Sequence, residues 1–217
     1  LVRINAFDTG YLAMKDLEAV LSSPVLPDGI VIPKVESALD VLNVSERLDA
    51  LGDQALDTRI VCMIESATSV LNMKEICAAS PHRMDAVIFG ADDYASTVGA
   101  TRTKTGEEMD FARNFLLMQA KAQGVEVIDL VQIDFHDEQQ LRKESRKSFE
   151  LGFNGKQVIH PKQIDPVQES YSPTQEAIDR AAAVVRANED RQRNGEGAFS
   201  FEGKMFDMPT VKLFESL

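Results

Sequence analysis

Two acidic positions have the type and spacing expected of a cation site. Glu65 ends the apolar run 59–65, and the pair Asp92-Asp93 follows the next such run, 84–90. If these runs form neighbouring parallel strands, about 5 Å apart, both carboxylates lie at the same edge of a sheet. Oxygen ligands of this kind suit Mg²⁺, which proteins often hold through one or two carboxylates. The alternatives are that Glu65 binds free N–H groups of a following helix and that Asp92-Asp93 lie in a solvated turn.

Arg3 and His160 are further candidates, each at the end of an apolar run. Arg3 stands between Val2 and Ile4. Since burying an unpaired guanidinium is costly, we expect it to face either a structural carboxylate or an anionic ligand. His160 ends the run 155–160 and precedes a proline, so it is either a site residue or part of a hydrogen-bonded turn.

Composition excludes several classes of function. The 217 residues carry 23 Lys+Arg against 35 Asp+Glu, for a net charge of -12, and no basic cluster, so we expect neither nucleic-acid binding nor binding to an anionic membrane. The apolar runs are strand-sized, too short to cross a bilayer. Cys62 and Cys77 predict core thiols in a reducing compartment, and the scattered histidines (82, 136 and 160) predict no zinc site.

The elements that must position these residues follow from an alternation of short Val/Ile-rich runs and longer segments with helical spacing. The predicted strands are 1–5, 29–35, 59–65, 84–90, 125–131 and 155–160. The predicted helices are 11–21, 38–48, 67–78, 109–123, 138–151 and 175–187. Continuous apolar strands indicate burial on both faces, and helical crossovers indicate parallel pairing, so the predicted class is α/β.

Two architectures share this pattern, a doubly wound sheet and a (β/α)8 TIM barrel. No Gly-x-Gly-x-x-Gly follows a predicted strand, which disfavours a dinucleotide fold. Polar residues gather at the carboxyl ends of the strands, where a barrel places its active site. Because a barrel needs eight βα units and the chain begins at Leu1 rather than Met, we expect an N-terminally truncated barrel of about six units. We predict an incomplete catalytic domain over 1–187 and a C-terminal lid or tail over 188–217.

Several strings in fixed order resemble the group formed by the citrate lyase beta subunit and malyl-CoA lyase, metal-dependent acyl-CoA lyases. They are IPKVES at 32–37, ESA at 65–67, FGADD at 89–93, IDLV at 128–131 and GKQVIHP at 155–161. The tail from Gly197 to Pro209 resembles the mitochondrial, citramalyl-CoA-cleaving branch of that group. The resemblance runs over essentially the whole chain, apart from the family's first two βα units.

The resemblance implies a TIM-barrel fold, usually trimeric, that binds Mg²⁺ and an acyl-CoA. The metal ligands would be Glu65 and Asp93, the second acid of its pair. Arg3 would be catalytic and would bind substrate together with Glu65. Asp207 would close over the active site of a neighbouring subunit and transfer a proton, and its apolar flanks lead us to expect a raised pKa.

The implied reaction is cleavage of citramalyl-CoA to acetyl-CoA and pyruvate in the mitochondrion, with a malyl-CoA or glyoxylate condensation of the same type as a variant. Two alternatives remain open. One is an aldolase of the same superfamily acting on free keto acids, which the Asp207 tail disfavours. The other is an inactive paralogue that serves as a binding or structural protein, which the missing first units favour.

Overall fold

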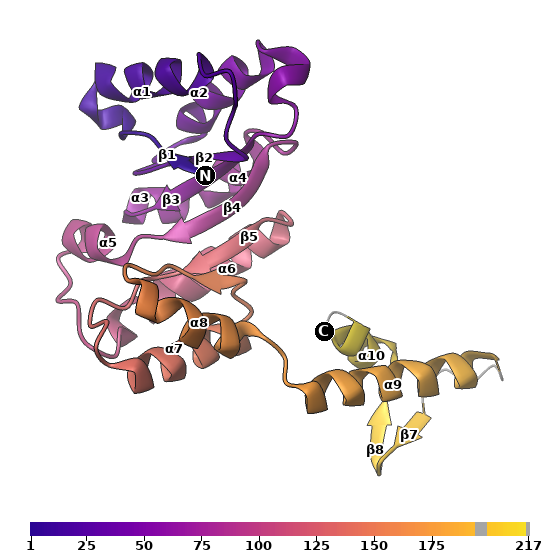
Figure 1. The fold of residues 1–217 in the computed structure, drawn as a ribbon. Coiled ribbons are helices and arrows are strands. Elements are labelled where there is room, and N and C mark those ends of the chain that lie inside the picture. Colours follow the sequence, from indigo (N-terminus) through magenta and orange to yellow (C-terminus); the bar gives the residue numbers. More distant parts are fainter. Residues whose placement is uncertain (194–198, 216–217) are drawn as a thin grey trace. The chain divides into compact units, whose positions relative to one another are not determined.

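A parallel sheet of six strands forms the core of the computed structural model, which describes residues 1–193 and 199–215 (Figure 1). The strands are β1 (Val2–Arg3), β2 (Gly29–Ile32), β3 (Arg59–Ile64), β4 (Met84–Phe89), β5 (Glu126–Asp129) and β6 (Gly155–Lys156). They pair in the order β1-β2-β3-β4-β5-β6, each parallel to the next. A doubly wound sheet would reverse its strand order, whereas this unbroken order is that of a barrel wall. The predicted α/β class is confirmed.

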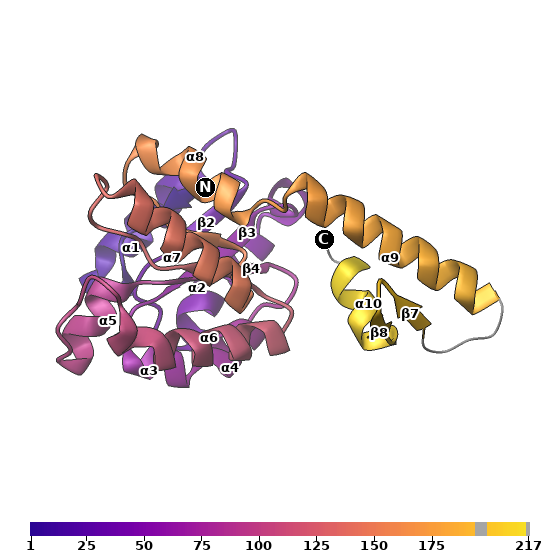
Figure 2. The same ribbon diagram turned by 90° about the horizontal axis from the view of Figure 1, so that it is seen from below.

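Helices follow each strand of the sheet, and several of them pack on it. They are α1 (Tyr11–Leu21), α2 (Ala38–Asp49), α3 (Ala67–Leu71), α4 (Met73–Ala78), α5 (Ala91–Val98), α6 (Asp110–Ala122), α7 (Glu138–Leu151) and α8 (Ile164–Tyr171), with short 3₁₀ turns at Phe7–Thr9, Gly52–Ala55, Glu107–Met109 and Pro161–Gln163. Helix α2 packs on β3, α6 on β4 and β5, and α7 on β6. Figure 2 shows α3, α4 and α6 side by side. The helix predicted over 67–78 is in fact two, which meet at Asn72.

Both faces of the sheet are apolar, as the continuous runs predicted. Side chains of one face are fully buried, among them Ile30, Ile32, Ile60, Cys62 and Ile64. Residues that alternate with these form a second cluster, in which Val31, Val61, Met63 and Ala86 are 4–8% exposed and pack with Ile88 and Ile128. Strand register aligns this cluster across the sheet, since Val31 pairs with Val61 and Val61 with Ala86. The sheet therefore has an inner and an outer apolar layer, as a barrel wall does.

The chain divides into two compact units, Leu1–Val167 and Gln168–Leu217. The second contains α9 (Gln175–Arg193), the antiparallel hairpin β7 (Phe199–Phe201) and β8 (Lys204–Phe206), and α10 (Met208–Glu215). Its own core includes Val184, Phe206 and Val211. Glu202 and Gly203 both have positive φ, 48° and 77°, as a two-residue hairpin turn requires. The sequence did not predict this hairpin or α10.

The division at Val167 differs from the predicted domain boundary at residue 187, which falls inside α9. The proposed lid over 188–217 includes Gly197 and Ala198, which lie outside the described residues. Within the described part of the chain, no helix combines the length and the apolar character needed to span a membrane.

Candidate active site

Glu65 follows β3 directly, and its carboxylate is held between the ends of the two flanking strands. The residue is 7% exposed, and its Oε2 accepts a hydrogen bond from the backbone N–H of Lys34, 2.8 Å away. On the other side lies Gly90, after β4. A Cβ at Gly90 would stand 2.4 Å from Glu65 Cγ and 2.6 Å from its Oε1, so only glycine leaves room for this carboxylate.

Lys34 comes just after β2 and contacts both predicted metal ligands. Its φ of 49° lies in the left-handed region that residues other than glycine seldom adopt. In this conformation its N–H binds Glu65, while its ammonium Nζ lies 3.7 Å from Asp93 Oδ1. The lysine side chain, 46% exposed, thus spans from the end of β2 to the residues that follow β4.

Asp92 and Asp93 lie in the first turn of α5 and not in a solvated turn, so that interpretation is wrong. Carboxylates are favoured at a helix N-terminus, and Gly99, with φ of 68°, caps the other end of α5. The Asp pair and Gly99 are the helix signals that sequence reasoning missed. The two acids diverge, because Asp92 pairs with Arg102 whereas Asp93 pairs with Lys34. Only Asp93 shares a partner with Glu65.

The surroundings of Glu65 act on its ionisation in opposite directions. Burial is the main effect and raises the pKa of this carboxyl above its ordinary value. The Lys34 N–H lowers the pKa, the negative charge of Asp93 raises it, and the charges of Lys34 and Arg3 lower it. Glu65 is therefore electrostatically coupled to Asp93, Lys34 and Arg3, three residues from different strand ends.

Arg3 is solvent-exposed at the edge strand β1, and its role toward a structural carboxylate or an anionic ligand stays a prediction. The strand spans only two residues, and Arg3 is aligned with Val31 of β2. Because β1 has no partner on its outer side among the described strands, the apolar neighbours in sequence do not enclose the arginine. Its position still brings its charge within electrostatic reach of Glu65.

The carboxylates of Glu65 and Asp93 fit a magnesium ion by their chemistry. The donor set is oxygen only, and the missing side chain at Gly90 leaves the room that the Glu65 carboxylate occupies at the strand ends. The described residues contain no group of three or more His, Cys, Asp or Glu placed to hold a metal. Two carboxylates nevertheless suffice for Mg²⁺, which keeps several water ligands.

Asp207 lies in the second unit, where it caps the N-terminus of α10. Its Oδ1 accepts hydrogen bonds from the N–H of Thr210 (3.0 Å) and from the Thr210 hydroxyl (2.6 Å). These bonds lower the pKa of the exposed carboxyl. The prediction of a raised pKa is therefore wrong for this conformation. The apolar flanking residues do not desolvate Asp207 because the helix cap holds it at the surface.

His160 forms the hydrogen-bonded turn that was one of its two interpretations. Its Nδ1 accepts the N–H of Lys162 at 3.1 Å, and its ring stacks on Phe135 with centroids 4.5 Å apart. The imidazole thus caps the short turn Pro161–Gln163. Both cysteines are buried, as predicted, and burial raises their pKa values, that of Cys77 to about 11.

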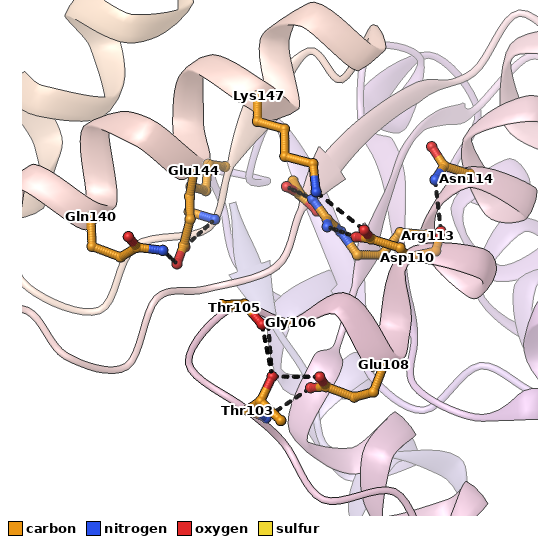
Figure 3. Close-up of polar contacts among 12 residues, drawn as sticks. Thr103, Thr105, Gly106, Glu108, Asp110, Arg113, Asn114, Gln140, Glu144 and Lys147 are labelled. Atoms are coloured by element: carbon orange, nitrogen blue, oxygen red, sulfur yellow. Dashed lines mark hydrogen bonds and ion pairs between the residues drawn. The ribbon is translucent and has the colours of Figure 1, made fainter.

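A cavity of about 370 Å³, which the sequence did not reveal, lies among α6, α7, the segment 102–109 and the segment 130–134. Figure 3 shows part of its wall, in which Thr103 binds Glu108 and Asp110 binds both Arg113 and Lys147. Its basic residues pair with acids of the same region: Arg102 with Asp92, Lys104 with Asp137, Arg113 with Asp110 and Asp129, Lys147 with Asp110, and Lys156 with Glu144. Its positive charges are therefore largely compensated within the protein.

Comparison with known proteins places these observations in a family. The HpcH/HpaI aldolase/citrate lyase family matches residues 1–161. The mitochondrial citramalyl-CoA lyase of Rattus norvegicus is 39% identical over 226 residues, which cover 100% of this chain and 67% of the rat protein. The citrate lyase subunit beta of Escherichia coli K12 is 35% identical, over 97% of this chain and 70% of the relative. The chain thus spans about two thirds of the length of the curated relatives it matches.

A solved structure shows the same fold with ligands. CitE from Mycobacterium tuberculosis in complex with magnesium, acetoacetate and coenzyme A is 30% identical to this chain, with a TM-score of 0.79 over 99% of this chain and 75% of CitE. The named relatives are lyases, which agrees with carboxylates and an arginine at the carboxyl ends of parallel strands. The chain belongs to the HpcH/HpaI aldolase/citrate lyase family.

Proposed function

We propose that this chain carries most of the active site of a Mg²⁺-dependent acyl-CoA lyase that cleaves citramalyl-CoA to acetyl-CoA and pyruvate. The observation that carries the proposal is the convergence of Glu65 and Asp93 on Lys34 at neighbouring strand ends. The similarity to a protein named citramalyl-CoA lyase supports the substrate, and the magnesium and coenzyme A bound by CitE support the cofactor and the thioester.

Glu65 and Asp93 would hold the magnesium ion, and Glu65 would also contact the substrate's oxygen atoms. The bound ion supplies Lewis acidity and a template for the hydroxyl and carboxylate oxygens of the substrate. The protein's own contribution is to hold the Glu65 carboxylate at a fixed position, through the Lys34 N–H and the space left at Gly90. Such preorganisation lowers the cost of placing the substrate.

Arg3 would stabilise the negative charge that develops in the reaction, and Asp207 would transfer a proton. Cleavage removes the proton of the substrate hydroxyl, breaks the adjacent carbon-carbon bond and leaves the acetyl-CoA enolate, which must receive a proton on carbon. Arg3 would stabilise the substrate carboxylate or the developing enolate oxygen, because a guanidinium adds positive charge where negative charge grows. Asp207 would transfer the proton through its carboxyl group.

For the assembly we propose a homotrimer in which the segment 188–217 acts as a lid, with Asp207 placed at the site of a neighbouring subunit. The exposed position of Asp207 in its own unit supports this role, since the carboxyl is accessible to another chain. The mitochondrial names of the rat and human relatives support a mitochondrial location.

The test is a pyruvate-release assay with citramalyl-CoA, coupled to lactate dehydrogenase, in Mg²⁺ and in excess EDTA. We expect turnover only with Mg²⁺ and its loss in Glu65→Gln, which keeps the side-chain shape and removes the charge. Turnover that persists in EDTA or in Glu65→Gln would contradict the proposal. Cleavage of a free hydroxy keto acid to pyruvate, but not of the thioester, would favour the aldolase alternative.

A further inference from the structure

Within the described site, Lys34 touches both proposed magnesium ligands, and the proposed function uses only its backbone N–H and gives its side chain no role. Its two contacts differ in kind. The backbone N–H binds Glu65 Oε2 at 2.8 Å, whereas the side-chain ammonium pairs with Asp93 Oδ1 at 3.7 Å. The first contact depends on the conformation of the residue, and the second depends on its charge.

The backbone conformation of Lys34 is energetically unfavourable, and its residue type does not relieve this. A φ of 49° is unfavourable for a residue with a Cβ, and β-branched residues tolerate it least. The conformation persists because the surrounding bonds hold it, including Val35 N–H to Met63 O at 3.2 Å. Strained backbone of this kind is found where it serves a site, and here it aims an N–H at a buried carboxylate.

Whereas the Lys34 N–H holds Glu65 in place for a cation, the Lys34 ammonium opposes cation binding. A positive charge beside Asp93 competes with a divalent ion for the same carboxylate and repels that ion. The Lys34 side chain is 46% exposed and that of Asp93 is 53% exposed, so the interaction is weakened by solvent but is not abolished.

We propose that Lys34 is a positioning residue that sets the affinity of the Glu65–Asp93 pair for Mg²⁺, with its N–H fixing Glu65 for binding and its ammonium competing for Asp93. This inference rests on the proposed function, because it takes Glu65 and Asp93 as the cation ligands. The inference gives Lys34 two effects. It joins the two ligands, and it limits the strength of Mg²⁺ binding.

The experiment measures the dissociation constant of Mn²⁺, as a probe for Mg²⁺, by electron paramagnetic resonance, without substrate. Lys34→Met keeps the length of the side chain and removes its charge, so we expect about threefold or more tighter binding at low salt and a smaller gain at high salt. Lys34→Arg keeps the charge and should bind as the wild type does. Lys34→Val is also uncharged but disfavours the left-handed conformation, and it should bind at least about threefold more weakly than Lys34→Met.

Lys121→Met is the matched control, because Lys121 lies 3.8 Å from Glu126 with similar exposures, 41% and 53%, at the opposite end of the sheet. It should leave Mn²⁺ binding unchanged. Equal affinities of wild type, Lys34→Met and Lys34→Val would overturn the inference, as would weaker binding by Lys34→Met. If the wild type fails to bind Mn²⁺, or Glu65→Gln binds equally well, the proposed site itself is wrong and the inference falls with it.

Discussion

At the scale of single residues, Glu65 shows how this site holds a carboxylate that its surroundings disfavour. Burial raises the pKa of Glu65, and the negative charge of Asp93 raises it further. The Lys34 N–H and the positive charges of Lys34 and Arg3 act against this rise. The pKa remains raised on balance, so the protein's own donors and charges do not fully offset the burial of this carboxylate.

Gly90 should be essential to this arrangement. Gly90→Ala places a Cβ within 2.6 Å of Glu65 Oε1, so the carboxylate must move. We expect a loss of about 1–3 kcal/mol of stability and a roughly tenfold weaker Mn²⁺ affinity, measured by thermal unfolding and cation titration. Gly155→Ala is the control, because its Cβ would approach only the end of the Ile128 side chain, at 3.1 Å. Unchanged Mn²⁺ affinity in Gly90→Ala would show that Glu65 is free to relocate.

Asp207 has a structural role that must be separated from its proposed catalytic one. Asp207→Asn keeps a good helix cap but loses the ionisable group, whereas Asp207→Ala loses both and should cost about 1 kcal/mol of stability in the second unit. We expect both variants to lose citramalyl-CoA turnover and only the alanine variant to lose stability. If Asp207→Asn retains turnover, Asp207 has only the structural role of capping α10 through Thr210, and its proposed catalytic role is wrong.

At the scale of elements, a buried ion pair joins α6 to β5. Arg113 on the helix donates to both carboxylate oxygens of Asp129, at 3.0 and 2.6 Å, and Asp129 is 0% exposed. Burial alone would raise the pKa of Asp129, but Arg113 and Lys156 hold it below its ordinary value. The pair therefore fixes α6, whose Arg113 lines the cavity and is labelled in Figure 3.

Asp129→Asn should cost about 3–5 kcal/mol in unfolding free energy, because it leaves Arg113 and Lys156 buried without their shared acid. Asp110→Asn, whose side chain is 32% exposed, should cost about 1 kcal/mol and serves as control. Since the folded-state pKa of Asp129 is lowered, its contribution is present at neutral pH and is lost as pH falls from about 4 through that lowered value. Denaturant titrations at pH 7 and pH 3 should therefore show a smaller difference between wild type and Asp129→Asn at pH 3.

The sequence predicted the elements whose patterns are unambiguous and missed those whose signals compete. Val/Ile-rich runs located all six strands of the parallel sheet, and helical spacing located α1, α2, α6, α7 and α9. Helix α5 was missed because two aspartates after a strand also suit a turn, although they favour a helix N-terminus equally. Strand order alone predicted that Glu65 lies near the Asp92-Asp93 pair, and the choice of Asp93 came from the family resemblance. The link of Glu65 and Asp93 through Lys34 could not be predicted, because it depends on a positive φ that no pattern indicates at a lysine.

At the scale of the whole molecule, the proposed trimer makes a prediction about mixed assemblies. If Asp207 acts on a neighbouring site, inactive Arg3→Ala and Asp207→Ala subunits together rebuild sites that contain an intact Arg3 and an intact Asp207. Random mixing should restore about a quarter of the wild-type citramalyl-CoA turnover. Activity should be measured after joint refolding, with separately refolded variants as controls. No recovery in verified mixed trimers would contradict sharing of sites between subunits.

The strand order described above also bears on how the molecule is made. Since each strand pairs with the next in sequence, the residues from Lys34 to Asp93 form a continuous stretch that needs only β2, β3, β4 and α5 to assemble the proposed cation ligands. Contacts between segments close in sequence form early, and synthesis delivers the chain from its N-terminus. The contacts that join the proposed ligands therefore need no residue of β5, β6 or the second unit, and the chain that forms them is synthesised before those elements.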